Sequence, residues 1–232
     1  MNIKLHIPDY PPIINNSVEF DFGEEESFLI VHGPNGCGKS TLLHILMGLK
    51  KSNGIPQIVV DDEKIFSTID FKETIRYLPQ NSEDGLFSRL SVEDNLTLLK
   101  ELLNIKDDFN TSYVDDAKIC MSLLSVGEKK NLLLDAILKS LPSTNDKWDK
   151  PLILLLDEPF AGLDIGKRGE VFTKIDSIAT NYKKHPLKFL IIDHQNISPG
   201  NIVKKSEIVL RKGIMLETIQ CQSIKKINND TD

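Results

Sequence analysis

The sequence predicts an α/β fold in which strands and helices alternate along the chain. A short apolar run at residues 28–31 is followed by a glycine-rich turn and then by apolar residues at helical spacing over 40–49. Residues 152–156 are almost uniformly apolar, which is typical of a strand in a parallel sheet with helices on both faces. Strands continue to alternate with helices as far as residues 208–210, and this order favours the α/β class.

The remaining elements follow from the periodicity of apolar residues. Short β-prone runs at 58–60 and 75–78 predict two further strands. Between Gln80 and Ser125 the pattern changes, because leucines recur at helical spacing over 92–103 and no β-rich run interrupts them. We interpret this stretch as a helical insert. Beyond it the sequence predicts helices at 129–141 and 171–179, strands at 189–192 and 208–210, a polar loop at 142–151 around Trp148, and a polar tail from residue 225.

The composition is that of an ordinary soluble globular protein, since 40% of the 232 residues are hydrophobic and 27% are charged. The formal net charge of −6 supplies no basic excess, so no direct contact with nucleic acid is expected. No run approaches the roughly 18 to 20 apolar residues that cross a bilayer, and no secretory signal is evident. Cys37, Cys120 and Cys221 are scattered and have no metal-ligand spacing, which indicates reduced thiols in a cytoplasmic protein.

A phosphate-binding loop is predicted at residues 33–41, which read Gly-Pro-Asn-Gly-Cys-Gly-Lys-Ser-Thr and contain the Walker A pattern. Its glycines let backbone N–H groups point at phosphate oxygens, and the following helix adds its positive dipole. Lys39 supplies a charge for the β- and γ-phosphates of ATP, and the Ser40 hydroxyl is a hard ligand for Mg²⁺. The predicted nucleotide-binding residues of this loop are Gly33, Pro34, Asn35, Gly36, Cys37, Gly38, Lys39, Ser40 and Thr41.

Two acidic residues follow the apolar strand at 152–156. A carboxylate at the C-terminal end of a central strand lies beside the phosphate loop in such folds. Asp157 is therefore a candidate ligand of Mg²⁺, directly or through water, and Glu158 is a candidate for polarising the attacking water. Taken alone, the pair fits equally well two acidic residues that begin a turn.

Several further segments resemble motifs of the ATP-binding cassette (ABC) ATPases. Residues 124–128, Leu-Ser-Val-Gly-Glu, resemble the Leu-Ser-Gly-Gly-Gln signature of that family. Residues 153–159 match its Walker B segment, 160–164 resemble its D-loop and 77–80 its Q-loop. His194, after Asp193, resembles the family's switch histidine. The motifs occur in the family's order from residue 10 to 194, so the resemblance covers nearly the whole chain.

The resemblance implies a P-loop NTPase core of the ABC type, with a small N-terminal antiparallel β part and a helical insert. Residues 1–80 would hold the β part and the first half of the ATP-binding core. Residues 81–128 would form a helical subdomain that ends in the signature motif. Residues 129–232 would complete the core and end in the polar tail.

The resemblance also implies a mechanism in which two cassettes associate head to tail and enclose two ATP molecules. The signature residues of one chain would act on the partner's ATP, with a hydroxyl, a backbone N–H group and the dipole of a helix starting at Glu128. The implied roles are catalysis by Lys39, Glu158 and His194; metal binding by Ser40, Gln80 and Asp157; adenine stacking by Tyr10; signature contacts by Ser125, Val126, Gly127 and Glu128; and a dimer contact by Asp164.

The sequence departs from the family pattern at several of these motifs. Val126 replaces a signature glycine, and Glu128 replaces glutamine and adds a carboxylate near the partner's ATP. Asn131 stands where an arginine is common, with Lys129 and Lys130 available to compensate. In the D-loop, Ala161-Gly162 replaces the common Ser-Ala or Asn-Ala. These departures bear on the rate of hydrolysis and not on the assignment.

Two functional classes fit this motif set. Residues 87–96 resemble the segment with which transporter ATPases meet their membrane subunit, so the favoured prediction is a transport-coupled ATPase at the cytoplasmic face of a membrane. Its partners would be a second cassette and a separate integral membrane subunit. The alternative is a soluble ABC ATPase acting on nucleic acid or ribosomes. The forty-odd residues between Gln80 and Leu124 leave no room for the long coiled coils of DNA-repair members.

Overall fold

The structure is a computed structural model. It describes residues 2–11, 13–14, 17–23, 27–66, 74–106, 109, 116–142, 150–182 and 187–193, and the backbone of 205–211 and 214–221. The predicted loop around Trp148, the predicted tail from residue 225 and the predicted switch residue His194 lie outside these ranges.

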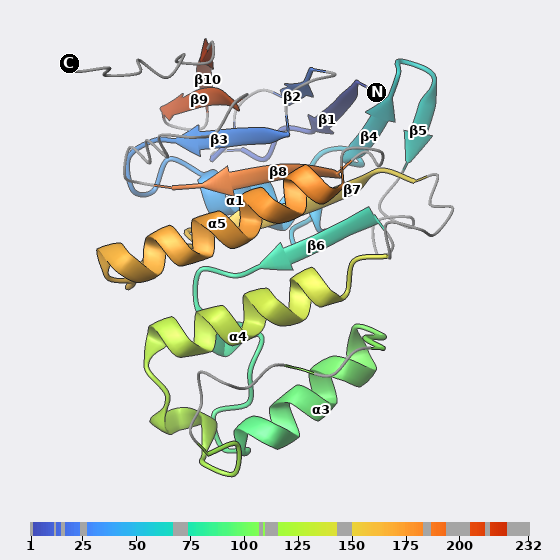
Figure 1. Cartoon of the computed structure of the whole chain (residues 1–232). Coiled ribbons are helices and arrows are strands. Elements are labelled where there is room, and N and C mark those ends of the chain that lie inside the picture. The colour runs from blue at the N-terminus through green and yellow to red at the C-terminus, as the bar shows by residue number, and fades with distance from the viewer. Residues whose placement is uncertain are drawn as a thin grey trace, which may run out of the picture.

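A six-stranded sheet forms the centre of the fold, with the strand order β10-β9-β3-β8-β7-β6 (Figure 1). Its strands are β3 (Phe28–His32), β6 (Ile75–Leu78), β7 (Leu152–Asp157), β8 (Leu187–Ile192), β9 (Lys205–Arg211) and β10 (Ile214–Cys221). Neighbouring strands pair in parallel, except that β9 and β10 pair antiparallel. The predicted α/β class is confirmed, and five of the predicted strands lie in this sheet.

A second, four-stranded sheet has the order β2-β1-β4-β5 and is antiparallel throughout. Its strands are β1 (Ile3–Ile7), β2 (Val18–Phe22), β4 (Gln57–Val60) and β5 (Lys64–Phe66). In β1 and β2 every second residue is buried, which is the pattern of strands with one face on a core. The predicted N-terminal antiparallel part is therefore confirmed.

The helices divide between the two faces of the six-stranded sheet. They are α1 (Lys39–Leu46), α3 (Val92–Leu102), α4 (Val126–Lys139) and α5 (Ile165–Asn181), with short 3₁₀ turns at Ser82–Asp84 and Met121–Leu123. Residues of α1 and the four-stranded sheet share one apolar cluster, and residues of α3, α4 and α5 share another. Figure 1 shows α4 between α3 and the sheet. Within the described residues, no helix combines the length and apolarity that a bilayer span requires.

These two clusters explain why β7 is apolar at successive positions. Leu154 and Leu156 belong to the cluster with α4 and α5, whereas Ile153 and Leu155 belong to the cluster with α1. Both faces of the strand are thus covered, so no position faces water. The strand carries Asp157 at its carboxyl end, where only 1% of the residue is exposed.

The predicted starts of two helices are wrong. The prediction followed apolar spacing, whereas polar capping residues determine where these helices begin. The Ser125 hydroxyl accepts a hydrogen bond from the Glu128 N–H, so α4 begins at Val126, before the predicted residue 129. The Asp164 carboxylate accepts from the Lys167 N–H at 2.9 Å, so α5 begins at Ile165, before the predicted residue 171. Helix α1 ends at Leu46, three residues before the predicted 49.

Candidate functional site

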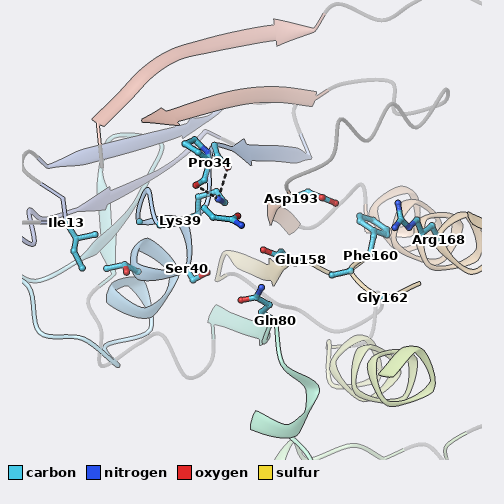
Figure 2. Close-up of a pocket in the computed structure, with 16 residues that line it drawn as sticks. Ile13, Pro34, Lys39, Ser40, Gln80, Glu158, Phe160, Gly162, Arg168 and Asp193 are labelled. Carbon is cyan, nitrogen blue, oxygen red and sulfur yellow. Dashed lines mark hydrogen bonds between the residues drawn. The ribbon is translucent and has the colours of Figure 1, made fainter. Parts of the chain in front are cut away.

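A cavity of about 1090 Å³ opens at the carboxyl ends of β3 and β7, beside the N-terminus of α1. This is the edge at which open parallel sheets bind their ligands. Figure 2 shows Ser40, Gln80 and Glu158 around one space, with Phe160 and Arg168 at its other end. The lining residues are Ile13, Gly33, Pro34, Asn35, Gly36, Gly38, Lys39, Ser40, Thr41, Gln80, Glu158, Phe160, Ala161, Gly162, Arg168 and Asp193.

The predicted phosphate loop curls around the buried side chain of Lys39. The Lys39 Nζ donates hydrogen bonds to the carbonyl oxygens of Gly33 at 2.8 Å and Pro34 at 3.0 Å. The lysine is only 5% exposed, so its charge sits inside the loop and at the cavity wall. Of the nine predicted loop residues, eight line the cavity and Cys37 lies buried beneath it.

Asp157 combines burial with an unsatisfied oxygen. Burial raises the pKa of its carboxyl, and a hydrogen bond from the Ser40 hydroxyl acts in the opposite direction. Its Oδ1 atom has no hydrogen-bond partner in the part of the chain that the structure describes. A buried carboxylate oxygen beside a serine hydroxyl is a donor set that suits Mg²⁺. Ser40 and Gln80 line the cavity, whereas Asp157 is not among its lining residues and is linked to it through the Ser40 hydroxyl. The residues predicted to hold a metal therefore fit that group.

Glu158 has an unusual backbone. Its φ angle is 49°, in the left-handed region that residues with a side chain rarely adopt. Its N–H donates to the Ile192 carbonyl at 2.9 Å, and its own carbonyl accepts from the Ala161 N–H at 3.1 Å. The carboxylate lines the cavity with Ser40 and Gln80 (Figure 2). A carboxylate in this position can polarise a water molecule next to a bound phosphate.

The cavity contains residues that the sequence did not assign. Ile13 and Phe160 contribute apolar surface, and Asp193 adds a carboxylate at the end of β8. Arg168, whose Nε donates to the Leu163 carbonyl at 2.9 Å, connects α5 to the predicted D-loop. Asp193 and the D-loop lie inside recognised motifs, whereas Arg168 is not distinguishable in sequence from other surface cations.

The structure does not bring Tyr10 to the cavity. A tight turn joins Tyr10 to Ile14, whose N–H donates to the Tyr10 carbonyl at 2.9 Å, and this turn places Ile13 at the cavity wall. The Tyr10 ring instead has the ammonium of Lys50 5.8 Å from its centroid. Ile13 thus lines the cavity close to the turn at Tyr10, and adenine stacking by Tyr10 stays a prediction.

The signature residues lie outside this cavity, at the N-terminus of α4. The Glu128 carboxylate accepts hydrogen bonds from the Ser125 N–H at 2.8 Å and from the Ser125 hydroxyl at 2.6 Å. These bonds lower the pKa of Glu128 and complete a capping box. The extra carboxylate therefore caps its own helix. The roles of Ser125, Val126, Gly127 and Glu128 towards a partner's ATP stay predictions, as does the interface role of Asp164.

Two of the departures from the family pattern lie next to each other in space. A Cβ atom built on Gly162 would lie 3.4 Å from Cγ1 of Val126, and Gly162 has a φ of 78°. At the next position, a Cβ atom on Gly127 would come within 2.9 Å of the Leu163 side chain. The start of α4 therefore lies directly against the D-loop.

Replacing Gly162 by alanine is expected to lower the free energy of unfolding by about 1 to 2 kcal/mol, because the left-handed backbone is strained for residues with a Cβ atom. Gly169→Ala is the matched control, since a Cβ atom there meets nothing within 4 Å and alanine favours the helix. Urea unfolding of both variants measures the difference. A Gly162→Ala variant as stable as the control would contradict the strain expected from the left-handed backbone at this position.

The fold and the cavity define a nucleotide-binding protein of the P-loop class. The sequence profile of the family described as "ABC transporter" matches residues 15–161, which is more than half of the chain. The chain belongs to the ABC transporter family.

Curated relatives include ATP-binding proteins of both import and export systems. The chain is 26% identical over 203 residues to a spermidine/putrescine import ATP-binding protein of Thermotoga maritima, covering 83% of this chain and 50% of that protein. It is 29% identical over 194 residues to a lipopolysaccharide export system ATP-binding protein of Haemophilus influenzae, covering 76% of this chain and 73% of that protein. The chain spans about half the length of the import relatives, 50% in the first case and 59% for a sn-glycerol-3-phosphate import protein of Bartonella bacilliformis.

Solved structures show the same fold. A dimeric ATP-binding cassette in a post-hydrolysis state, bound to ADP and phosphate, superposes with a TM-score of 0.68 at 18% identity and covers 96% of this chain and all of that one. A nucleotide-free cassette from an ABC transporter gives a TM-score of 0.65 at 18% identity and covers 95% of this chain and 92% of that one.

Proposed function

We propose that the chain is the ATP-hydrolysing subunit of a membrane transporter and acts in a head-to-tail pair of cassettes. The observation that carries the proposal is the convergence of Lys39, Ser40, Gln80 and Glu158 on one cavity. These residues come from three separate parts of the sequence, and each supplies a group that phosphoryl transfer requires.

In this proposal the loop at 33–41 holds the phosphates of ATP through its N–H groups and the Lys39 charge. Ser40, Gln80 and Asp157 would hold Mg²⁺, which neutralises charge on the phosphate oxygens. Glu158 accepts a hydrogen bond from the attacking water. The new bond forms between the water oxygen and the γ-phosphorus, and the bond to the β,γ-bridging oxygen breaks, which leaves ADP and phosphate.

Exposed apolar groups at the starts of α4 and α5 support a role for a second cassette. Val126 is 57% exposed beside Ser125, and Ile165, next to the capping residue Asp164, is 89% exposed. Apolar side chains next to polar signature groups suit an interface with a partner of the same type. The solved relative with bound ADP and phosphate is itself dimeric, which supports this arrangement.

Contact with a membrane subunit is proposed through the segment at 86–96. Phe87 is 58% exposed and Leu90 36%, whereas the neighbouring Leu86 is buried. This segment is tied by backbone hydrogen bonds to the residues that precede the signature, from the Ser122 N–H to the Ser88 carbonyl at 3.0 Å and from the Met121 N–H to the Leu90 carbonyl at 2.8 Å. A displacement of Phe87 would thus reach Ser125 through a short, bonded path. The relatives' names place such chains with import and export systems, in keeping with a position at the cytoplasmic face of a membrane.

Crosslinking from residue 87 tests the transporter role. A photoreactive amino acid at Phe87, introduced in native membranes, is expected to capture an integral membrane protein, because its exposed ring would lie at that contact. The matched control carries the probe at Leu102, which is 74% exposed at the end of α3 and outside the segment. Capture of soluble proteins alone from residue 87, or equal capture of the membrane protein from both positions, would argue against this docking segment.

A further inference from the structure

A buried cation of the signature helix reaches the loop that carries Glu158. Lys130 lies in the second turn of α4 and is only 2% exposed. Its Nζ donates a hydrogen bond to the Glu158 carbonyl and a longer one, of 3.4 Å, to the Ala161 carbonyl. One side chain therefore joins the helix that begins at the signature to both ends of the turn after Glu158.

This contact acts on a strained backbone. The left-handed φ of 49° at Glu158 is unfavourable for a residue with a Cβ atom and persists only where surrounding bonds hold it. The bond to Ile192 fixes the N–H side of the residue, and the bonds from Ala161 and Lys130 fix its carbonyl. The backbone conformation in turn sets the direction of the carboxylate into the cavity.

Lys130 also balances charge at this end of the sheet. Burial lowers the pKa of its ammonium, and the carboxylates of Glu158, Asp157 and Asp193 act in the opposite direction. The neighbouring Lys129 has a different environment, because its Nζ lies 3.8 Å from the Glu83 carboxylate. Of the two lysines that could compensate for the missing arginine at 131, Lys130 is thus the one that touches the Glu158 loop.

We propose that Lys130 is a positioning residue for hydrolysis: it holds the Glu158 carbonyl from the signature helix and thereby aims the carboxylate that polarises the attacking water. The inference rests on the proposed function of the chain as an ATPase. It also gives the signature helix a direct influence on the chain's own catalytic glutamate, since a shift of α4 moves the donor at the Glu158 carbonyl.

The test compares Lys130→Met, Lys130→Arg and Lys129→Met in the full chain. Lys130→Met is expected to lower kcat by about twentyfold or more, because a small misplacement of a reacting group has effects of this size. The affinity for ATP, measured by equilibrium titration, is expected to stay within about threefold, since Lys130 is not among the residues that line the cavity. Lys130→Arg keeps a cationic donor and is expected to retain kcat within about fivefold, and Lys129→Met within about twofold.

Three results would overturn the role of Lys130. They are a Lys130→Met variant within about threefold of the unaltered kcat, a loss of ATP affinity in step with kcat, and equal losses in the Met and Arg variants. If Lys130→Met does not fold, Lys130→Gln replaces it under the same thresholds. An unaltered chain that hydrolyses no ATP would overturn the proposed function as well, whereas an active chain with an active Lys130→Met variant would overturn only the positioning role.

Discussion

Replacing Glu158 by glutamine is expected to lower the rate of ATP hydrolysis by about a hundredfold or more and to leave ATP binding intact. The amide keeps the size and most of the shape of the carboxylate but accepts a hydrogen bond from water far less strongly. General-base contributions of this kind are worth roughly a hundredfold to ten-thousandfold. The backbone bonds to Ile192 and Ala161 do not involve the side chain, so the loop is expected to keep its conformation.

The same variant is expected to accumulate as an ATP-dependent dimer, because ATP would lie between the two paired cassettes and, without hydrolysis, the γ-phosphate that both contact would stay in place. Phosphate release and light scattering after size-exclusion chromatography measure the two effects on one preparation. Glu101→Gln, which changes an exposed carboxylate on α3, is the matched control and is expected to behave as the unaltered chain. A Glu158→Gln protein that stays monomeric with ATP and hydrolyses it at the normal rate would remove both proposed roles.

Replacing Lys39 by alanine is expected to weaken ATP binding by roughly thirtyfold or more, because a charge-assisted hydrogen bond to a phosphate contributes about 2 kcal/mol. Hydrolysis should fall to background. The ammonium also bonds the Gly33 and Pro34 carbonyls, so its loss releases the loop that has to present N–H groups to the phosphates.

The control for this variant is Lys51→Ala, which removes an exposed cation a short distance along the chain. Titration with a fluorescent ATP analogue reports binding, and circular dichroism of the same samples reports folding. ATP affinity equal to that of the Lys51 control, in folded protein, would show that the cavity does not hold the phosphates as proposed.

Sequence patterns predicted the parts of this fold that depend on local burial. The run at 152–156 predicted β7 because both faces of that strand are covered, and the Walker A spacing predicted a loop that does line a cavity. The helix starts at Val126 and Ile165 escaped prediction because exposed polar caps, and not apolar spacing, determine them. Strands β1 and β2 alternate buried residues with half-buried or exposed ones, and this period of two is also present in their residue types.

Contacts between distant segments were beyond the reach of these patterns. Nothing local to Val126 or Gly162 indicates that the two residues are neighbours in space, although each is a departure from its motif. The place of Ile13 in the cavity depends on the turn between Tyr10 and Ile14. Backbone hydrogen bonds hold this turn, and the residue types do not predict them. The contact of Lys130 with the Glu158 carbonyl likewise joins residues 28 positions apart.

The capping box at the start of α4 means that the signature serine is already engaged in the single chain. The Ser125 hydroxyl donates its hydrogen bond to the Glu128 carboxylate, and this bond lowers the pKa of Glu128 and so favours its ionised form. A phosphate arriving from a partner would have to exchange with this internal anion at Ser125, so pairing of the cassettes would be a ligand exchange in which one acceptor replaces another. In the proposed pair, a partner without ATP would offer Ser125 no acceptor to replace Glu128, so the capping box would favour nucleotide-bound partners over empty ones.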